Sequence, residues 1–280
     1  MIEIRNLKKR YSDGTRALNG ITAEIDDKVA TIIGRNGAGK TTLMRILSTQ
    51  LLQTSGSATI NGYDVVKEAN KIRKMIVSIP QEASTVGYLT PMEHLKIYLT
   101  ARGSSIAQAE QDAAAALKAL ELWNARSTPC DMLSGGMKRK VFVAMALAAN
   151  AEIVFLDEPT TGLDPVSRFE VWSSIKMLKS NLILTTHYMD EAQELSKKVI
   201  MIDDGKIKEE GTPDALLRRF SGKVRAESQF KDPSAKYKIG NTYIRYISPS
   251  EAEEYVKKGY SIKRPTLDDL FIVHGVELEA

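Results

Sequence analysis

The sequence contains one cysteine, Cys130, among its 280 residues. A single thiol excludes an intramolecular disulfide, and such sparing use of cysteine is typical of a reducing compartment. Cys130 follows Ser127-Thr128-Pro129, a pattern that predicts a loop. A free structural thiol is therefore the expected role of this residue.

Long hydrophobic runs are also missing. The most apolar stretch, residues 141–156, is interrupted by Asn150 and Glu152, and it is shorter than the roughly 20 residues that a membrane-spanning helix needs. It predicts a buried helix that runs into a buried strand. Residues 1–5 alternate in polarity and predict a strand instead of a signal peptide. We therefore expect a soluble or peripheral chain that depends on a partner for any role at a membrane.

Charge of one sign does not predominate. The net charge of +4 is too small to imply nucleic acid as a partner, and the apolar content of 43% is enough for a sizeable core. Only residues 223–264 are biased, with ten basic and five acidic side chains. This excess is typical of a solvated surface, and it also fits contact with lipid headgroups or an acidic partner.

The most informative stretch that is present is a glycine-rich loop. It follows the apolar run 29–33, which predicts a buried strand, and it leads into a helical pattern that begins near Lys40. Glycines let successive backbone N–H groups point at a phosphate, and the helix N-terminus adds positive potential. Lys40 supplies a mobile cation, and the Thr41 hydroxyl can bind Mg²⁺. The expected ligands of a nucleoside triphosphate are Gly34, Arg35, Asn36, Gly37, Ala38, Gly39, Lys40, Thr41 and Thr42.

The order of the remaining patterns predicts an α/β core. Short apolar runs at residues 75–79, 153–156 and 182–186 indicate buried strands, and the helical patterns between them favour a mainly parallel sheet covered on both faces. Residues 87–150 change to helical character after a capping box at Thr90 to Glu93. We interpret them as a helical insertion.

Antiparallel strands are expected outside this core. Residues 2–5 and 17–25 alternate in polarity, and Asn61-Gly62 is a strong hairpin signal. A second hairpin is predicted around Asp203-Asp204-Gly205. From about Lys223 the apolar runs are short, which predicts a small α+β appendage.

An acidic pair, Asp157 and Glu158, follows the strand at 153–156. We expect this strand to lie beside the strand that leads into the glycine-rich loop. Asp157 could then hold Mg²⁺ at the carboxyl end of the sheet. Glu158 could polarise the attacking water as a general base.

Several motifs follow in a fixed order around the glycine-rich loop, namely Tyr11, Gln81, Leu133-Ser134-Gly135-Gly136, Gly162-Leu163-Asp164 and Thr185-Thr186-His187. With these motifs, residues 1 to about 220 resemble the ATP-binding cassette family of ATPases. The resemblance implies a P-loop ATPase domain over residues 1–220, with a helical subdomain at about 87–150 and an antiparallel β subdomain. A small accessory domain would follow at residues 223–280. ATP and Mg²⁺ are the implied cofactors.

The resemblance also implies roles for single residues. Glu158, His187 and Gln81 would be catalytic, with Gln81 also sensing the membrane partner and His187 contacting the γ-phosphate. Tyr11 would stack on adenine, although by residue type alone it is typical of a half-buried strand aromatic. The implied metal ligands are Thr41, Gln81 and Asp157.

Four residues resemble those that, in this family, complete the ATP site of another cassette. Ser134, Gly135 and Gly136 match the signature loop, and Asp164 likewise reaches across. With one cassette in the chain, the resemblance implies a homodimer or heterodimer that encloses two ATP molecules.

Two features resemble the branch that serves exporters of the ABC-2 type. Met137, followed by basic residues, replaces the glutamine most often found at this position, and residues 265–271 match the ending typical of that branch. A plain amphipathic C-terminal helix, with Leu267, Leu270 and Phe271 on one face, is the competing interpretation.

The expected function is therefore that of an ATPase subunit of an exporter, bound peripherally at the cytoplasmic face of the membrane through separate permease subunits. A soluble cassette ATPase that acts on nucleic acid or ribosomes is the alternative. The stretch between Gln81 and Ser134 is too short for the long coiled coil of the chromosome-maintenance relatives, and translation-linked relatives usually carry two cassettes. A binding module that hydrolyses little ATP is disfavoured by the presence of both Glu158 and His187.

Overall fold

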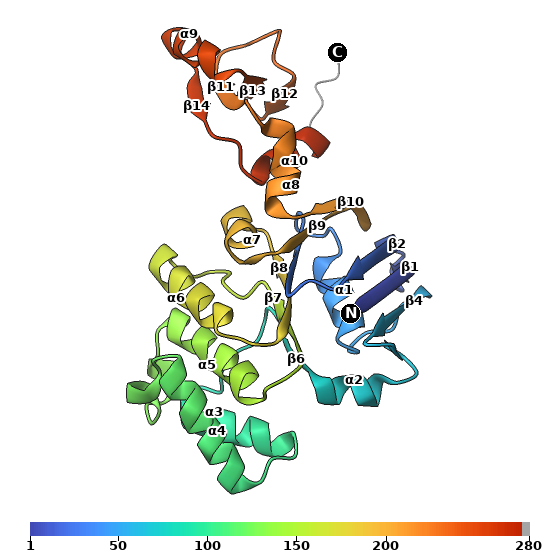
Figure 1. The fold of residues 1–280 in the computed structure, drawn as a ribbon, viewed down its shortest axis with the longest axis vertical. Coiled ribbons are helices and arrows are strands. Elements are labelled where there is room, and N and C mark those ends of the chain that lie inside the picture. The colour runs from blue at the N-terminus through green and yellow to red at the C-terminus, as the bar shows by residue number, and fades with distance from the viewer. Residues whose placement is uncertain (276–280) are drawn as a thin grey trace.

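The computed structural model describes residues 1–275, and within them the strands form three sheets (Figure 1). The first sheet is antiparallel and has the order β2-β1-β4-β5. Its strands are β1 (Ile2–Arg10), β2 (Arg16–Ile25), β4 (Ser55–Ile60) and β5 (Tyr63–Asp64). Asn61 and Gly62 both have positive φ, 49° and 81°, which is the turn that the Asn-Gly pair predicts for this hairpin.

The second sheet is the centre of the molecule and has the order β10-β9-β3-β8-β7-β6. Five strands are parallel and β10 is antiparallel at one edge. They are β3 (Val29–Ile33), β6 (Ile76–Ile79), β7 (Ile153–Asp157), β8 (Asn181–Thr186), β9 (Lys198–Asp203) and β10 (Lys206–Gly211). All five residues of β7 are buried, as a continuous apolar run predicts for a strand covered on both faces.

The strand order corrects one expectation. β7, which carries Asp157, is not beside β3, because β8 lies between them and pairs with both. The packing of each crossover helix on the sheet decides which strands become neighbours, and the order of the motifs in the sequence does not. The inserted strand brings Thr185 and Thr186 between the glycine-rich loop and the acidic pair.

Two separate cores cover the faces of the central sheet. On one face, α1 (Lys40–Leu47) packs between the central sheet and the antiparallel sheet, with Leu43, Ile46 and Phe155 fully buried (Figure 1). A short helix, α2 (Ala69–Met75), also contributes Ile72 to this core. The sequence analysis did not predict α2, since seven residues with a single buried apolar side chain carry little periodicity.

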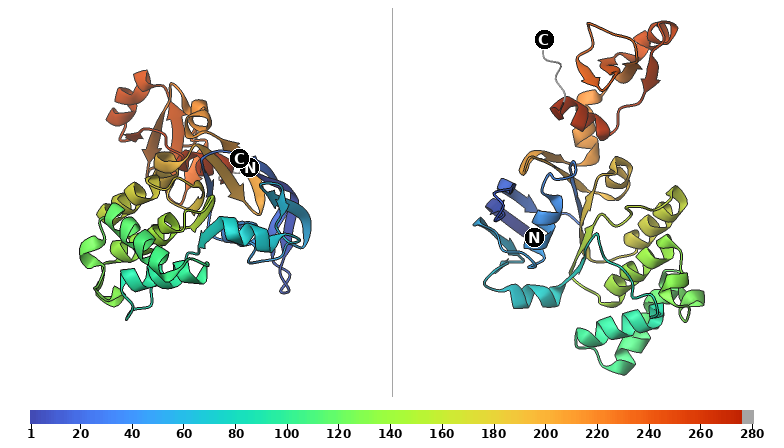
Figure 2. Two further views of the ribbon diagram at one scale, coloured as in Figure 1. Left: turned by 60° about the horizontal axis from the view of Figure 1, so that its bottom comes forward. Right: turned by 180° about the vertical axis from the view of Figure 1, so that it is seen from behind.

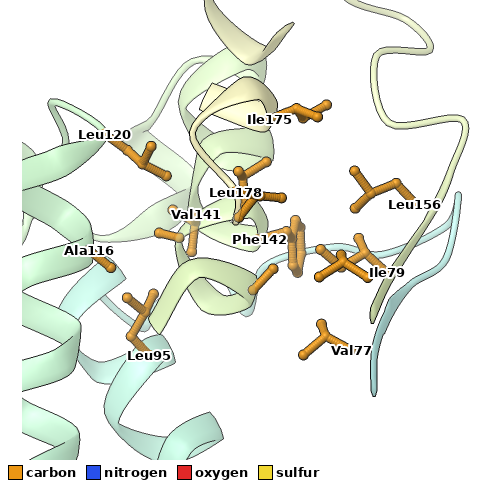
Figure 3. Close-up of a cluster of buried hydrophobic side chains, with 14 of the residues drawn as sticks. Val77, Ile79, Leu95, Ala116, Leu120, Val141, Phe142, Leu156, Ile175 and Leu178 are labelled. Carbon is orange, nitrogen blue, oxygen red and sulfur yellow. The ribbon is translucent and has the colours of Figure 1, made fainter. Parts of the chain in front are cut away.

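The helical insertion covers the other face. It consists of α3 (Pro91–Ala101), α4 (Ile106–Ala119) and α5 (Gly135–Ala148), together with the one-turn 3₁₀ helices η1 (Trp123–Ala125) and η2 (Cys130–Met132). The predicted capping box is confirmed, because Thr90 accepts from the Glu93 backbone and the Glu93 side chain accepts from Thr90. Figure 3 shows Phe142 of α5 beside Val77 and Ile79, while α4 meets α5 on its other side.

Cys130 is fully buried and free, which confirms the prediction of an unpaired thiol. It begins η2 instead of lying in a loop. Burial raises the pKa of this thiol, so the sulfur is held as a neutral core group.

The second half of the ATPase-like region adds α6 (Pro165–Lys176) and α7 (Met189–Leu195) after β7 and β8. A short helix, α8 (Pro213–Leu217), and η3 (Arg218–Phe220) then lead away from β10. None of the helices within residues 1–275 has the length and hydropathy to cross a membrane.

The third sheet belongs to the C-terminal part, which stands at the opposite end of the molecule from the helical insertion (Figures 1 and 2). Its order is β12-β13-β11-β14, and it carries α9 and α10. The elements are β11 (Val224–Ser228), β12 (Tyr237–Ile239), β13 (Thr242–Ile247), η4 (Pro249–Glu251), α9 (Ala252–Lys257), β14 (Ser261–Lys263) and α10 (Asp268–Gly275). The α+β appendage predicted from the sequence is thus present, and residues 276–280 of its expected range lie outside the described part.

The C-terminal helix packs against the central sheet. Leu267 and Leu270 are fully buried in a cluster with Ile33, Met189 and Phe220. The Arg35 guanidinium lies so near the end of α10 that a Cβ at Gly275 would be 2.5 Å from it. The apolar side chains predicted for residues 267–271 therefore pack this helix beside the glycine-rich loop.

Candidate functional site

A cavity of about 620 Å³ opens where the carboxyl ends of β3 and β8 meet the glycine-rich loop. Residues from five separate parts of the chain line it. It brings together ten of the residues predicted for the site: Tyr11, Asn36, Gly37, Gly39, Lys40, Thr41, Thr42, Gln81, Glu158 and His187.

Two glycines of the glycine-rich loop are packed too closely to accept a side chain. Gly39 has φ +105°, and a Cβ there would lie 2.3 Å from the Ala17 carbonyl oxygen. A Cβ at Gly34 would lie 2.4 Å from the Ile202 carbonyl oxygen. The backbone thus passes between β2 and β9 and enters α1, whose first-turn N–H groups have no acceptor within the helix and can bind an anion.

Lys40 is the cation at the base of the loop, and its side chain is only 5% exposed. Its Nζ donates to the carbonyl oxygens of Gly34 at 2.8 Å and Arg35 at 3.2 Å. It also lies 3.5 Å from Glu158 Oε1. These contacts hold the ammonium group in the cavity, where it can meet a bound polyanion.

Glu158 has an unusual backbone conformation. Its φ is +48°, which is sparsely populated for a residue with a side chain and costs of order 1 kcal/mol. Its N–H donates to the backbone oxygen of Thr185 at 3.1 Å and to the Thr185 hydroxyl at 3.0 Å. The Thr185 hydroxyl in turn donates to Asp157. One threonine of β8 therefore holds both members of the acidic pair.

The Glu158 carboxylate is the point on which the cavity side chains converge. Its Oε2 accepts from Gln81 Nε2 at 3.3 Å and from the Thr161 hydroxyl at 2.9 Å. The same oxygen lies 2.9 Å from His187 Nδ1. The backbone of Gln81 is fixed to α5, because Arg139 Nη2 donates to the Gln81 backbone oxygen at 3.0 Å.

Tyr11 lies at the mouth of the cavity, directly after β1. Its hydroxyl is 3.1 Å from the Thr42 hydroxyl, which ties the ring to the first turn of α1. Lys9 Nζ lies 5.3 Å from the ring centroid. The aromatic ring is therefore positioned next to the loop, as a flat surface for a ligand's apolar end.

Thr41, Gln81 and Asp157 offer a hydroxyl, an amide and a carboxylate oxygen from three neighbouring elements. Hard oxygen donors of this kind fit Mg²⁺, which keeps several waters and also binds the substrate's phosphates. Asp157 is buried at the end of β7, while Thr41 and Gln81 line the cavity.

Ser134, Gly135, Gly136 and Asp164 do not line this cavity. The Ser134 hydroxyl caps α5 by accepting from Met137 N at 3.2 Å, and Ser134 and Gly135 are exposed. Asp164 caps α6 by accepting from the Val166 and Ser167 backbones at 3.0 and 3.1 Å. The two helix starts touch, because a Cβ at Gly136 would lie 2.9 Å from Ser167 Cβ.

Three residues at or beside the site were not predicted from the sequence. Thr161 lines the cavity, Thr185 holds the acidic pair, and buried Glu191 bonds to Thr160. Thr185 was named only as part of a motif, and Glu191 reads like an ordinary polar residue of a short helix. Its position in the first turn of the helix that directly follows His187 was the signal available.

Comparison with known proteins gives consistent results. A profile of the family described as "ABC transporter" matches residues 18–161. The daunorubicin/doxorubicin resistance ATP-binding protein DrrA of Streptomyces peucetius is 37% identical over 301 residues, covering 97% of this chain and 91% of that protein. ABC transporter A family member 6 of Dictyostelium discoideum is 37% identical over 225 residues, which span 78% of this chain but only 14% of that protein.

Solved structures show the same arrangement of elements. A structure described as the ATP binding subunit of an ABC transporter has a TM-score of 0.68 and 27% identity, covering 79% of this chain and 93% of that chain. The ATP-binding cassette MJ0796, solved as a dimer in a post-hydrolysis state bound to ADP and Pi, has a TM-score of 0.68 and 26% identity. That alignment covers 76% of this chain and 98% of the other.

Proposed function

Because this chain belongs to the ABC transporter family as an ATP-binding subunit, we propose that it hydrolyses ATP as one half of a dimer that drives separate membrane subunits. The observation that carries the catalytic part is the convergence on Glu158. Lys40, Gln81 and His187, from three different elements, all reach its carboxylate inside one cavity.

The cavity supports a division of roles for ATP. Tyr11 stacks on the adenine, and the backbone N–H groups of residues 37–42 bind the phosphates together with Lys40 Nζ. Glu158 accepts a proton from the attacking water, which as general base catalysis contributes about 10²–10⁴-fold in rate. Gln81 orients that water, and His187 contacts the γ-phosphate.

Mg²⁺ is the metal that suits the oxygen donors Thr41, Gln81 and Asp157. When bound, it neutralises charge on the β- and γ-phosphates. Thr185 keeps Asp157 and Glu158 in fixed relative positions, so that the residue facing the metal and the residue facing the water act on the same phosphate.

The residues outside the cavity support a shared site. Ser134 and Gly135 are exposed at the start of α5, where unpaired N–H groups favour an anion, yet they do not line their own chain's cavity. We infer that Ser134, Gly135, Gly136 and Asp164 complete the ATP site of a second cassette, identical or related. The dimer described for MJ0796 is consistent with this arrangement.

The proposed output is export through separate permease subunits, with this chain bound peripherally at the cytoplasmic face. Met137, the ending at residues 265–271 and the similarity to a drug-resistance ATP-binding protein support the exporter branch. Residues 1–220 would form the ATPase domain and residues 223–280 an accessory domain.

The alternative, a soluble cassette ATPase acting on nucleic acid or ribosomes, has less support. Within residues 1–275 the longest helices, α4 and α5, have 14 residues each, which is too short for an extended coiled coil.

The transport role is tested by affinity purification of the chain from detergent-solubilised membranes, after expression with its neighbouring reading frames. Recovery of a multi-spanning protein in stoichiometric amount supports the proposal, and recovery of ribosomes or DNA instead would overturn it. A Lys40→Ala variant, which lacks the cation proposed to bind the phosphates, serves as the control for ATP-dependent changes in the recovered complex.

A further inference from the structure

Glu191 is a charged residue in a position where charge is costly. It lies in the first turn of α7, and 1% of its surface is exposed. Its Oε1 accepts from the Thr160 hydroxyl at 2.8 Å and from Trp172 Nε1 at 2.8 Å. Its Oε2 is buried without a hydrogen-bond partner in the described structure.

The two donors are buried as well. Thr160 is 0% exposed and Trp172 is 4% exposed, so neither can turn to water if Glu191 is removed. Burial raises the pKa of Glu191, and the side chains of Thr186, Thr160 and Trp172 oppose that rise. An apolar residue at this position would avoid the desolvation of the carboxyl, but it would leave both donors unpaired.

The three bonded elements are those that carry the site. Thr160 lies two residues after Glu158, in the turn that holds Glu158 at positive φ. Glu191 lies four residues after His187. Trp172 belongs to α6, the helix that Asp164 caps. Thr185 of β8 is bonded to the first residue of this turn, Glu158. Glu191 of α7 is bonded to Thr160, two residues further along the turn.

We propose that Glu191 is a positioning residue for ATP hydrolysis, whose Oε1 fixes the turn of Glu158 against the His187 segment and against α6. This inference rests on the proposed roles of Glu158 and His187. It adds that movement of α6, which begins at the dimer-facing Asp164, reaches the general base through Trp172 and Thr160. Glu191 does not touch ATP in this scheme and acts only through Glu158 and His187.

A merely structural role makes different predictions. If Glu191 only fills the core, its replacement lowers stability and leaves the kinetic constants of the folded fraction unchanged. If it positions the Glu158 turn, kcat falls while the KM for ATP stays the same, because the phosphate ligands on α1 are untouched.

The experiment measures Mg²⁺-dependent ATPase kinetics and thermal unfolding for Glu191→Leu, Glu191→Gln and Thr160→Val. Glu191→Leu and Thr160→Val are expected to lower kcat by about tenfold or more with KM unchanged, since each removes the hydrogen bond that fixes the Glu158 turn to α7. Glu191→Gln keeps an oxygen acceptor and is expected to retain kcat within about threefold. The matched control is Glu194→Gln, an exposed acid of the same helix, which should match the unaltered protein.

A double variant sharpens the result. Glu191→Leu with Thr160→Val should be no slower than the slower single variant, because both remove the same bond. Equal losses of kcat in Glu191→Gln and Glu191→Leu would overturn the proposal. An unchanged kcat in Thr160→Val would also overturn it, and this second outcome can be measured even if Glu191→Leu fails to fold. Failure of the proposed function is distinguishable, since then Glu158→Gln would hydrolyse ATP at the normal rate.

Discussion

His187 Nδ1 lies 2.9 Å from Glu158 Oε2, which joins two residues that are 29 positions apart in the sequence. The other carboxylate oxygen of Glu158 lies 3.5 Å from Lys40 Nζ. The proposed general base is therefore held between the lysine proposed to bind the phosphates and the histidine proposed to contact the γ-phosphate. A triphosphate that binds both Lys40 and His187 would change the contacts of the two side chains that orient Glu158. On the proposed roles, this geometry would couple nucleotide binding to the position of the base.

The aromatic ring of Tyr11 provides a test of base recognition. Tyr11→Ala should weaken ATP binding by about 1–3 kcal/mol, the usual contribution of base stacking on an aromatic side chain. Tyr11→Trp should retain affinity, because it keeps the stacking surface. Tyr11→Phe removes only the bond to Thr42, so it separates stacking from the hydroxyl contact. Titration with a fluorescent ATP analogue measures all three, and unchanged affinity in Tyr11→Ala would exclude stacking.

The contact between the starts of α5 and α6 predicts the effect of a single methyl group. Gly136→Ala places a Cβ 2.9 Å from Ser167 Cβ and 3.0 Å from Ser167 Oγ, so the two helix starts must separate. ATPase activity should fall by about tenfold, with ATP binding to the monomer unchanged, because the affected residues are outside the cavity. Gly136→Ala combined with Ser167→Gly should recover part of the loss. Gly211→Ala, where a Cβ meets its nearest atom at 3.6 Å, is the neutral control.

The buried carboxyl of Glu191 predicts a pH-dependent stability difference. Burial raises its pKa in the folded protein above the ordinary value of 4.5, so as pH rises the unfolded chain loses this proton first. The stabilising contribution of Glu191 is complete below that ordinary value and is lost as pH rises through the folded pKa. Relative to the unaltered protein, Glu191→Gln should therefore gain free energy of unfolding as pH rises from the ordinary value of 4.5 through the raised pKa of the folded protein. Urea denaturation measures this difference, and a constant difference across pH would contradict the raised pKa.

The buried carboxylate of Asp269 is expected to stabilise the C-terminal part. It is fully buried, and it accepts from Arg225 at 3.0 Å, Tyr246 at 2.5 Å and the Thr266 backbone at 2.7 Å. Asp269→Ala leaves the largely buried Arg225 without this partner and should cost about 3–5 kcal/mol in the stability of this part. Limited proteolysis should then cleave after residue 223 much faster, while Glu253→Gln on the exposed α9 should behave like the unaltered protein. Equal cleavage rates would contradict the predicted role.

Much of the fold was predictable from local sequence patterns. The strand before the glycine-rich loop, the capped helix after Thr90 and the Asn61-Gly62 hairpin each depend on a few adjacent residues, and the structure confirms all three. Continuous burial of β7 also follows from its own apolar run. These features are local because hydrophobic periodicity and turn chemistry act over one element at a time.

The parts that were not predictable depend on contacts between distant residues. The insertion of β8 between β3 and β7 follows from crossover packing, which leaves no mark in the strand sequences. Glu191 has the residue type of a solvated helix surface, and only its buried bonds to Thr160 and Trp172, which are distant in the sequence, show its place in the core. The packing of α10 beside Arg35 likewise joins residues far apart in the chain.

The central claim is that ATP closes a dimer and that Glu158 is needed to hydrolyse it. Sedimentation velocity of the Glu158→Gln variant, with and without Mg·ATP, tests this most directly, with Glu253→Gln as the matched control. We predict that Glu158→Gln binds ATP, loses turnover by about 10²–10⁴-fold and sediments as a stable dimer only when ATP is present. Adding Ser134→Arg to Glu158→Gln should abolish the dimer without affecting ATP binding to the monomer. A Glu158→Gln chain that stays monomeric with ATP bound, or that turns over ATP at the normal rate, would contradict the account.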